Sequence, residues 1–163
     1  MKTINWTQVA LFISASRDAK AASRIILPLV LLLFSGTASL AQCDKDLSLT
    51  SSKTEYLDAQ GALQRTEDEK STIEITKTEV TITPGNADHK MKGTIKSHTC
   101  NWKVPFKEGK SVIQAAFSDE QKGTMNATIT IEGRDGSVTL LMEAVEMPDR
   151  KIRVPIDKFE EKR

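Results

Sequence analysis

The stretch NATITIEGRDGSVTLLMEAVEM, residues 126–147, decides the fold. Its apolar residues recur at nearly every second position, the period of a β-strand, on both sides of the segment Gly133-Arg134-Asp135-Gly136. An Asp-Gly pair between two alternating runs is a strong short-range signal for a tight hairpin. We therefore expect strands over 126–132 and 137–147, joined by a β-turn.

The same alternation continues through most of the chain after residue 45. We expect further strands over 71–77, 79–83, 91–106, 111–117 and 151–156, a weaker one over 46–50, and a weak hairpin over 56–64. In 91–106 the apolar set changes parity after Ile95, which predicts a bulge or bend near Ser97. Pro155 cannot donate to a ladder, so 151–156 is expected to be an edge strand or to end at a rim. The charged segment 157–163 is expected to be helical or frayed.

Short turns between these strands leave no room for the crossovers that parallel pairing needs. The sequence therefore predicts an all-β fold, an antiparallel meander of about 7–8 strands. About eight strands can curl into a small barrel with a filled core or one small ligand. A lipocalin-like barrel, open or closed, is the first architecture we expect, and a β-sandwich is the alternative. The similarity to lipocalins is one of size and strand rhythm.

A ten-residue uncharged run, Ile25 to Phe34 (IILPLVLLLF), precedes this β domain. A helix that spans a bilayer needs about 20 residues, so this run is too short to be one. Its length is that of the hydrophobic region of a signal peptide. The unusually long region before this run carries four positive charges and one negative charge, on Lys2, Arg17, Lys20, Arg24 and Asp18. We expect residues 1–41 to be a signal peptide and residues 42–163 a single secreted domain.

Small residues at Ser39 and Ala41 predict cleavage between Ala41 and Gln42. The alternative is a lipoprotein signal, because Leu40-Ala41-Gln42-Cys43 resembles a lipobox and would lead to lipidation of Cys43. Cleavage at Ala41 would leave the protein exported, as a secreted or periplasmic domain. Lipidation would instead anchor it to a membrane.

Two cysteines, Cys43 and Cys100, remain after cleavage, an even number in a compartment where disulfides persist. We expect them to be bonded to each other. Chain-entropy arguments assign roughly 4 kcal/mol to the closure of a loop of this length.

Residues 42–163 hold 19 Lys and Arg against 21 Asp and Glu, a balance that gives no long-range attraction to nucleic acid. No basic stripe with interleaved aromatic residues occurs, so we expect no nucleic-acid partner. We also expect no transmembrane segment in the mature chain, and a monomer.

The sequence contains few of the patterns that carry catalysis. Phosphate-binding glycine loops and the Gly-x-Ser-x-Gly elbow are absent, and His98 beside Cys100 is too small a set for a metal once Cys100 is bonded. The carboxylates considered as a glycosidase pair alternate with apolar residues and are better interpreted as a solvent-exposed face: Glu74, Glu79, Glu132, Glu143 and Glu146. We expect no enzyme, no cofactor and no catalytic residue.

Two functional hypotheses remain. The first is a non-catalytic binding module for a small apolar ligand or an envelope component. Its possible pocket lining is Ile129, Ile131, Leu140, Met142, Ile152 and Val154, a set that could equally be a filled core. The second is a structural or interaction protein of the cell envelope, without a pocket.

Overall fold

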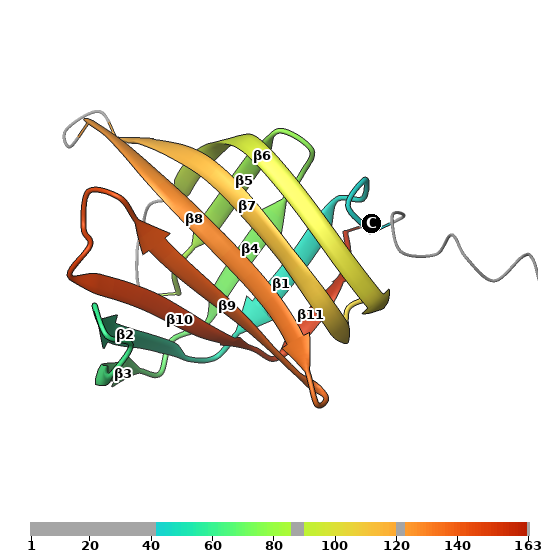
Figure 1. Ribbon diagram of the computed structural model, residues 1–163, viewed down its shortest axis with the longest axis horizontal. Helices are drawn as coiled ribbons and strands as arrows, with labels where there is room; N and C mark the ends of the chain where they lie inside the picture. The colour runs from blue at the N-terminus through green and yellow to red at the C-terminus, as the bar shows by residue number, and fades with distance from the viewer. Residues whose placement is uncertain (1–41, 86–89, 120–122, 163) are drawn as a thin grey trace, which may run out of the picture. The chain divides into compact units, whose positions relative to one another are not determined.

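The computed structural model describes residues 42–85, 90–119 and 123–162, which form one antiparallel sheet of eleven strands and contain no helix (Figure 1). The strands are β1 (Leu47–Ser51), β2 (Thr54–Asp58), β3 (Leu63–Glu67), β4 (Ser71–Ile75), β5 (Glu79–Thr83), β6 (Met91–Val104), β7 (Glu108–Asp119), β8 (Gly123–Arg134), β9 (Ser137–Ala144), β10 (Arg150–Ile156) and β11 (Lys158–Glu161). The all-β antiparallel prediction is confirmed. The sandwich alternative is wrong, because all strands belong to a single sheet.

The strand count is higher than the seven or eight expected because the weak hairpin over 56–64 supplies two strands, β2 and β3, and the segment expected to be helical or frayed supplies β11. Short breaks at 52–53, 68–70 and 157 separate β1 from β2, β3 from β4, and β10 from β11. The alternating pattern shows where the chain is extended, but it does not show where a ladder of hydrogen bonds is interrupted.

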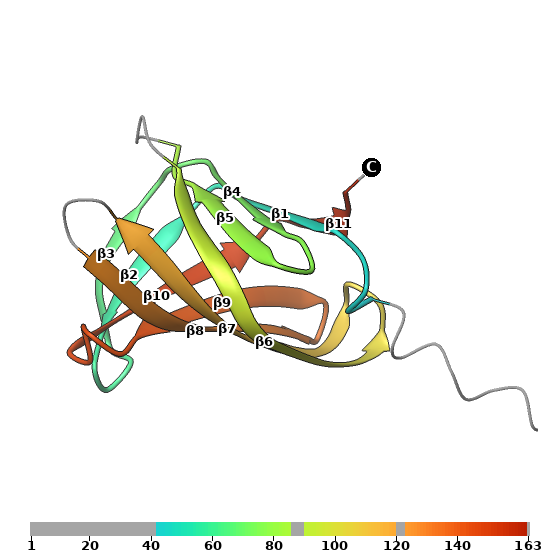
Figure 2. The same ribbon diagram turned by 90° about the horizontal axis from the view of Figure 1, so that it is seen from above.

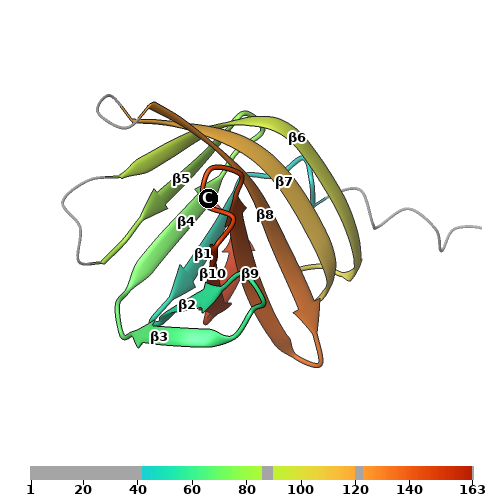
Figure 3. The same cartoon turned by 60° about the vertical axis from the view of Figure 1, so that its left-hand side comes forward.

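The hydrogen-bonded order is β11-β1-β4-β5-β6-β7-β8-β9-β10-β2-β3, so the sheet is not closed into a barrel. It is nevertheless strongly curled, and Figures 2 and 3 show the strands arranged around a common interior. Strand β1 pairs with β11, with Leu47 opposite Glu161, and β2 pairs with β10, with Asp58 opposite Arg150. These two ladders have the same register, although the hydrogen bonding between them is interrupted. The first and last stretches of the domain therefore lie alongside each other.

Pro155 lies at this break. Arg153, two residues earlier, is the last residue of β10 that pairs with β2, while Pro155 itself still pairs with Thr139 of β9. The Ser51 hydroxyl donates to the Pro155 carbonyl at 2.6 Å, and the Asp157 amide donates to the Thr50 carbonyl at 2.9 Å. Because proline has no N–H to offer, the ladder is interrupted here and a side chain bridges the gap.

The interior face of the sheet holds a continuous apolar core. Its members come from β1 and from β4 to β10, because alternate residues of each strand point to the same side. Fully buried members include Leu47, Leu49, Ile73, Ile75, Val80, Ile113, Ile129 and Ile131.

Strand β6 carries the predicted irregularity. Its register against β7 shifts between Ile95 and Ser97, which confirms the bulge that the parity change indicated. A second shift between Trp102 and Val104 was not expected. It leaves Trp102 buried, whereas the Val104 side chain is 43% exposed.

The last residues of the chain differ from the expectation of a helical or frayed end. Lys158–Glu161 form β11 and pair with β1, with Phe159 opposite Leu49. The expected signal peptide, residues 1–41, lies outside the described residues. Among those described, no helix is long and apolar enough to cross a membrane.

Candidate binding groove and the disulfide end of the sheet

The six residues expected to line a pocket lie on the interior face of β8, β9 and β10. Ile129, Ile131, Leu140, Met142 and Val154 are buried members of the core, and Ile152 is half-buried and packs against it. They are neighbours across the sheet, since Ile129 pairs with Met142 and Met142 with Ile152. The structure therefore brings the set together as packed core residues.

A hollow of about 530 Å³ lies on the opposite, outer face of the same strands. Its lining alternates in sequence with the core residues, as Thr130 does with Ile129 and Leu141 with Leu140. We call this hollow the outer groove. Its lining is Leu57, Gly61, Lys110, Thr130, Glu132, Arg134, Ser137, Thr139, Leu141, Glu143, Lys151 and Arg153.

The floor of the outer groove has an apolar part. Thr130 pairs with Leu141 and Leu141 with Arg153, which places the Leu141 side chain between polar neighbours on adjacent strands. Leu57 of β2 is only 4% exposed, yet it pairs with Lys151 and does not belong to the interior core cluster. The turn after β2 is held by the Asp58 carboxylate, which accepts the Gln60 and Ala62 amides at 3.0 and 2.8 Å.

Four basic and two acidic side chains surround this floor. Glu132 forms ion pairs with Arg134 at 3.1 Å and with Lys110 at 3.9 Å. Glu143 forms an ion pair with Lys151 at 2.9 Å. Arg153 pairs with Glu55, which is outside the lining. The lining therefore holds more cations than acids, and each of these cations already pairs with a carboxylate.

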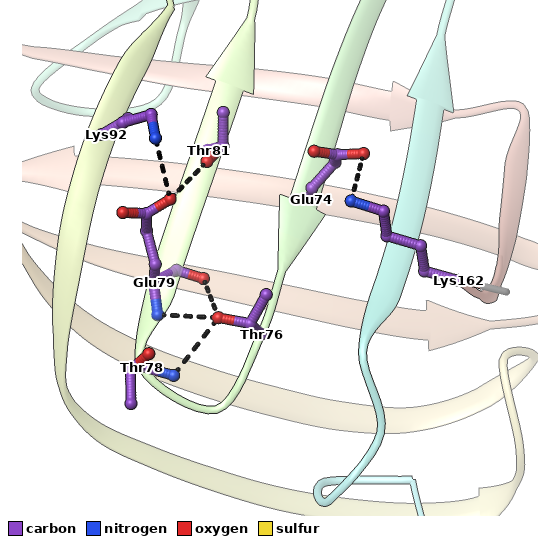
Figure 4. A network of polar contacts seen from close by, with 7 residues as sticks. All are labelled: Glu74, Thr76, Thr78, Glu79, Thr81, Lys92 and Lys162. Atoms are coloured by element: carbon purple, nitrogen blue, oxygen red, sulfur yellow. Dashed lines mark hydrogen bonds and ion pairs between the residues drawn. The ribbon is translucent and has the colours of Figure 1, made fainter.

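The five carboxylates considered as catalytic candidates all have polar partners. Glu132 and Glu143 lie in the outer groove, and Glu146 accepts the Asn126 amide and side-chain NH₂ at 2.9 Å, which lowers the pKa of the Glu146 carboxyl. Figure 4 shows the other two: Glu74 pairs with Lys162 at 2.8 Å, and Glu79 pairs with Lys92 at 3.4 Å. Glu79 also accepts the Thr81 hydroxyl at 3.0 Å.

The two cysteines meet at one end of the sheet. The sulfur atoms of Cys43 and Cys100 are at bonding distance, with Cα atoms 6.0 Å apart, as expected from the cysteine count. His98 lies on the same face of β6 as Cys100, with its Nε2 at 3.5 Å from the Cys100 sulfur. Burial lowers the pKa of His98. The three side chains could approach one metal ion, but a disulfide withdraws both thiolates from coordination.

The residue after the expected cleavage point is fixed in the same region. The Gln42 side chain is buried, and its Oε1 accepts the Phe106 backbone N–H at 3.1 Å. Nearby, Phe159 packs edge-on against both Trp102 and Phe106, with ring centroids 5.5 and 5.0 Å apart. Ala41 lies outside the described residues.

Sequence reasoning did not identify the outer groove. Its residues look like the ordinary solvent face of strands, and only the pairing register places Lys110, Glu132, Thr139 and Arg153 around one hollow. The one signal was the regular recurrence of both charges opposite the core positions of β8–β10. Comparisons with protein-family models, with curated proteins and with solved structures find no match to this chain.

Proposed function

We propose that the mature domain is an exported, non-catalytic binding module that takes a small anionic amphiphile in the outer groove. The observation that carries this proposal is the hollow of about 530 Å³ whose basic side chains surround an apolar floor. Its size falls within the range of about 300–1,000 Å³ typical of small-molecule sites. The earlier hypothesis of a small ligand is kept, and its site moves from the interior to the outer face.

Each part of such a ligand has a matching group. A phosphate or carboxylate would accept charge-assisted hydrogen bonds from Lys151 and Arg153, whose present partners Glu143 and Glu55 hold them at the groove. A short alkyl part would cover Leu57 and Leu141. The hydroxyls of Thr130 and Thr139 offer further polar contacts.

A lipocalin-like architecture, in the open form, belongs to the same proposal. It is supported by the curl of the sheet and by the common register that β1 with β11 and β2 with β10 maintain across the break. The filled interior separates this protein from a carrier that encloses its ligand, because the inward residues of β8–β10 are already packed.

Export to a secreted or periplasmic location is also proposed. The uncharged run 25–34 and the small residues before Gln42 support it, and the Cys43–Cys100 bond gives weaker support. That bond competes with lipidation, because the same Cys43 sulfur cannot carry a lipid and a disulfide. The free, bridged domain is therefore preferred over the anchored lipoprotein.

Calorimetric titration of the disulfide-bonded chain 42–163 tests the ligand class, with octyl phosphate as the probe and octyl glucoside as the neutral control. We expect octyl phosphate to bind with an affinity that decreases as the salt concentration is raised, and we expect no binding of octyl glucoside. The double variant Lys151→Gln/Arg153→Gln should weaken binding about tenfold or more, equivalent to about 1.4 kcal/mol. Lys103→Gln, an exposed lysine outside the groove, should leave it unchanged. Equal binding of both probes would contradict the proposal.

A second candidate is an interaction protein that binds through a sheet edge. Strand β3 stands at one end of the strand order, and Leu63, Gln64, Arg65 and Thr66 are all exposed. A photo-crosslinker at Gln64, compared with one at Thr130 in the outer groove, separates the two functions in the native source. A protein captured from Gln64 alone favours the edge, and a small molecule captured from Thr130 alone favours the groove.

A further inference from the structure

Gln42 is polar, yet its side chain is almost fully enclosed, with 3% of the residue exposed. Its amide oxygen is satisfied by the Phe106 N–H. Its amide nitrogen, Nε2, is buried and has no hydrogen-bond partner among the described residues. A buried donor left without a partner costs about 1–3 kcal/mol.

The expected cleavage after Ala41 would bring a reactive group to this side chain. It would leave the α-amino group of Gln42 as the first group of the mature chain, at the spacing from the side-chain carbonyl carbon Cδ that closes a five-membered ring. An uncyclised Gln42, with its unpaired Nε2, suits its enclosed position poorly.

We propose that Gln42 is a modification site, at which the new N-terminus cyclises to pyroglutamate. The unprotonated α-amine attacks the side-chain carbonyl carbon Cδ and forms a five-membered lactam. The bond between Cδ and Nε2 breaks, and Nε2 leaves as ammonia, taking up the proton that the α-amine gives up. No oxidant, reductant or other reactant is consumed.

The product removes the unpaired side-chain donor and retains a carbonyl on Cδ. The unpaired Nε2 is the atom that leaves, and the lactam nitrogen carries no charge at neutral pH. The carbonyl on Cδ remains to accept the Phe106 N–H. Because Gln42 is enclosed in the folded domain, cyclisation takes place on the newly exported chain before folding is complete. The ring then lies beside Cys43 and its bond to Cys100, where it blocks attack by aminopeptidases.

This inference rests on the proposed cleavage between Ala41 and Gln42. The test is intact mass and N-terminal sequencing of the unreduced protein, purified after export from the full 163-residue chain. We expect a mass lower by one ammonia than that of the linear, bridged chain 42–163. We also expect an N-terminus blocked to sequencing until pyroglutamyl peptidase treats the unfolded protein. A synthetic peptide of residues 42–53, taken through the purification steps alone, measures the cyclisation that handling causes, and the exported protein must exceed that level.

Gln42→Asn is the matched control, because asparagine keeps the amide but would need a strained four-membered ring to cyclise. It should be exported with a free N-terminus and no loss of ammonia, and its melting temperature should be lower than that of the wild type. A wild-type chain that begins at Gln42 with a free amine overturns the cyclisation and leaves the export proposal standing. A chain that begins at a lipidated Cys43 overturns both.

Discussion

At the scale of single residues, Trp102 shows how the sequence fills the disulfide end of the sheet. Its indole is 1% exposed, and its Nε1 donates to the Ser111 hydroxyl at 2.8 Å. The ring lies against the backbone of β8 at Gly133, where an added Cβ would come within 2.8 Å of the ring and 2.5 Å of the Lys107 carbonyl oxygen. The alternation in residues 91–106 places Trp102 in the apolar set that follows the change of parity. It could not show that a glycine on another strand makes room for it, because that contact depends on register.

Replacing Gly133 with alanine tests this contact. We expect a loss of about 2–3 kcal/mol in the free energy of unfolding, because both the Trp102 ring and the Lys107 backbone must move. Urea denaturation followed by Trp102 fluorescence measures it. Gly61→Ala is the control: nothing lies within 4 Å of the added Cβ, and the cost there is the strain of a φ of +85°, about 1 kcal/mol. Equal losses in the two variants would contradict the packing described.

His98 predicts how stability depends on pH. Burial lowers the pKa of His98 in the folded state below its ordinary value of about 6.5, so the unfolded chain binds a proton more readily than the folded one. The contribution to stability is fully present above about pH 6.5 and is lost as the pH falls below that value. Urea midpoints measured from about pH 7.5 downward should decline in the wild type, and the slope should be smaller in His98→Gln. An unchanged slope in the variant would assign the dependence to other groups.

At the scale of strands, local pattern predicted the elements whose partners are neighbours in sequence. The β8–β9 hairpin is present, with Arg134 opposite Ser137 and with Asp135 and Gly136 at φ of 52° and 78°, the conformation that an Asp-Gly turn favours. Strand β11 was missed, because the segment DKFEEKR has one apolar side chain and its partner β1 lies more than 100 positions earlier. Long-range pairing overrides a weak local preference here.

Phe159 tests whether β11 is a structural strand. Phe159→Ala removes the ring that packs on Trp102 and Phe106, and we expect a loss of about 2–3 kcal/mol, below the full cost of a buried phenylalanine because the ring is half-buried. Amide hydrogen exchange should also become faster in residues 158–161. Lys158→Ala, at an exposed position of the same strand, should change neither measurement. A Phe159→Ala protein as stable as the wild type would show that residues 158–161 do not contribute to the fold as a strand.

At the scale of the whole domain, the disulfide joins the N-terminal segment to the middle of the chain, and the first and last strands lie side by side. The alternation of apolar residues predicted the all-β class of the domain, and the cysteine count predicted this bond. They could not predict the outer groove, whose lining comes from β2 and from β7 to β10 and exists only once those strands are in register. The sequence therefore identified the inner face of β8–β10, while the candidate site lies on their outer face.

Removal of the disulfide should destabilise the domain without changing its strands. The double variant Cys43→Ser/Cys100→Ser should lose up to about 4 kcal/mol of unfolding free energy, the chain-entropy value for a loop of this length. Urea denaturation of the variant, compared with wild type in excess reductant, measures the loss. The two samples should agree. A variant as stable as the oxidised wild type would show that the two thiols are not bonded in the native protein.

The central claim, that ligand is taken by the outer face and not by the interior, is tested most directly by NMR on the disulfide-bonded chain 42–163 with labelled leucine methyl groups. Leu57 and Leu141 line the outer groove, whereas Leu49 and Leu140 belong to the interior core. With octyl phosphate added, we expect nuclear Overhauser contacts from the octyl chain to Leu57 and Leu141 and none to Leu49 or Leu140. Contacts to Leu49 and Leu140, or to no leucine at all, would contradict the account.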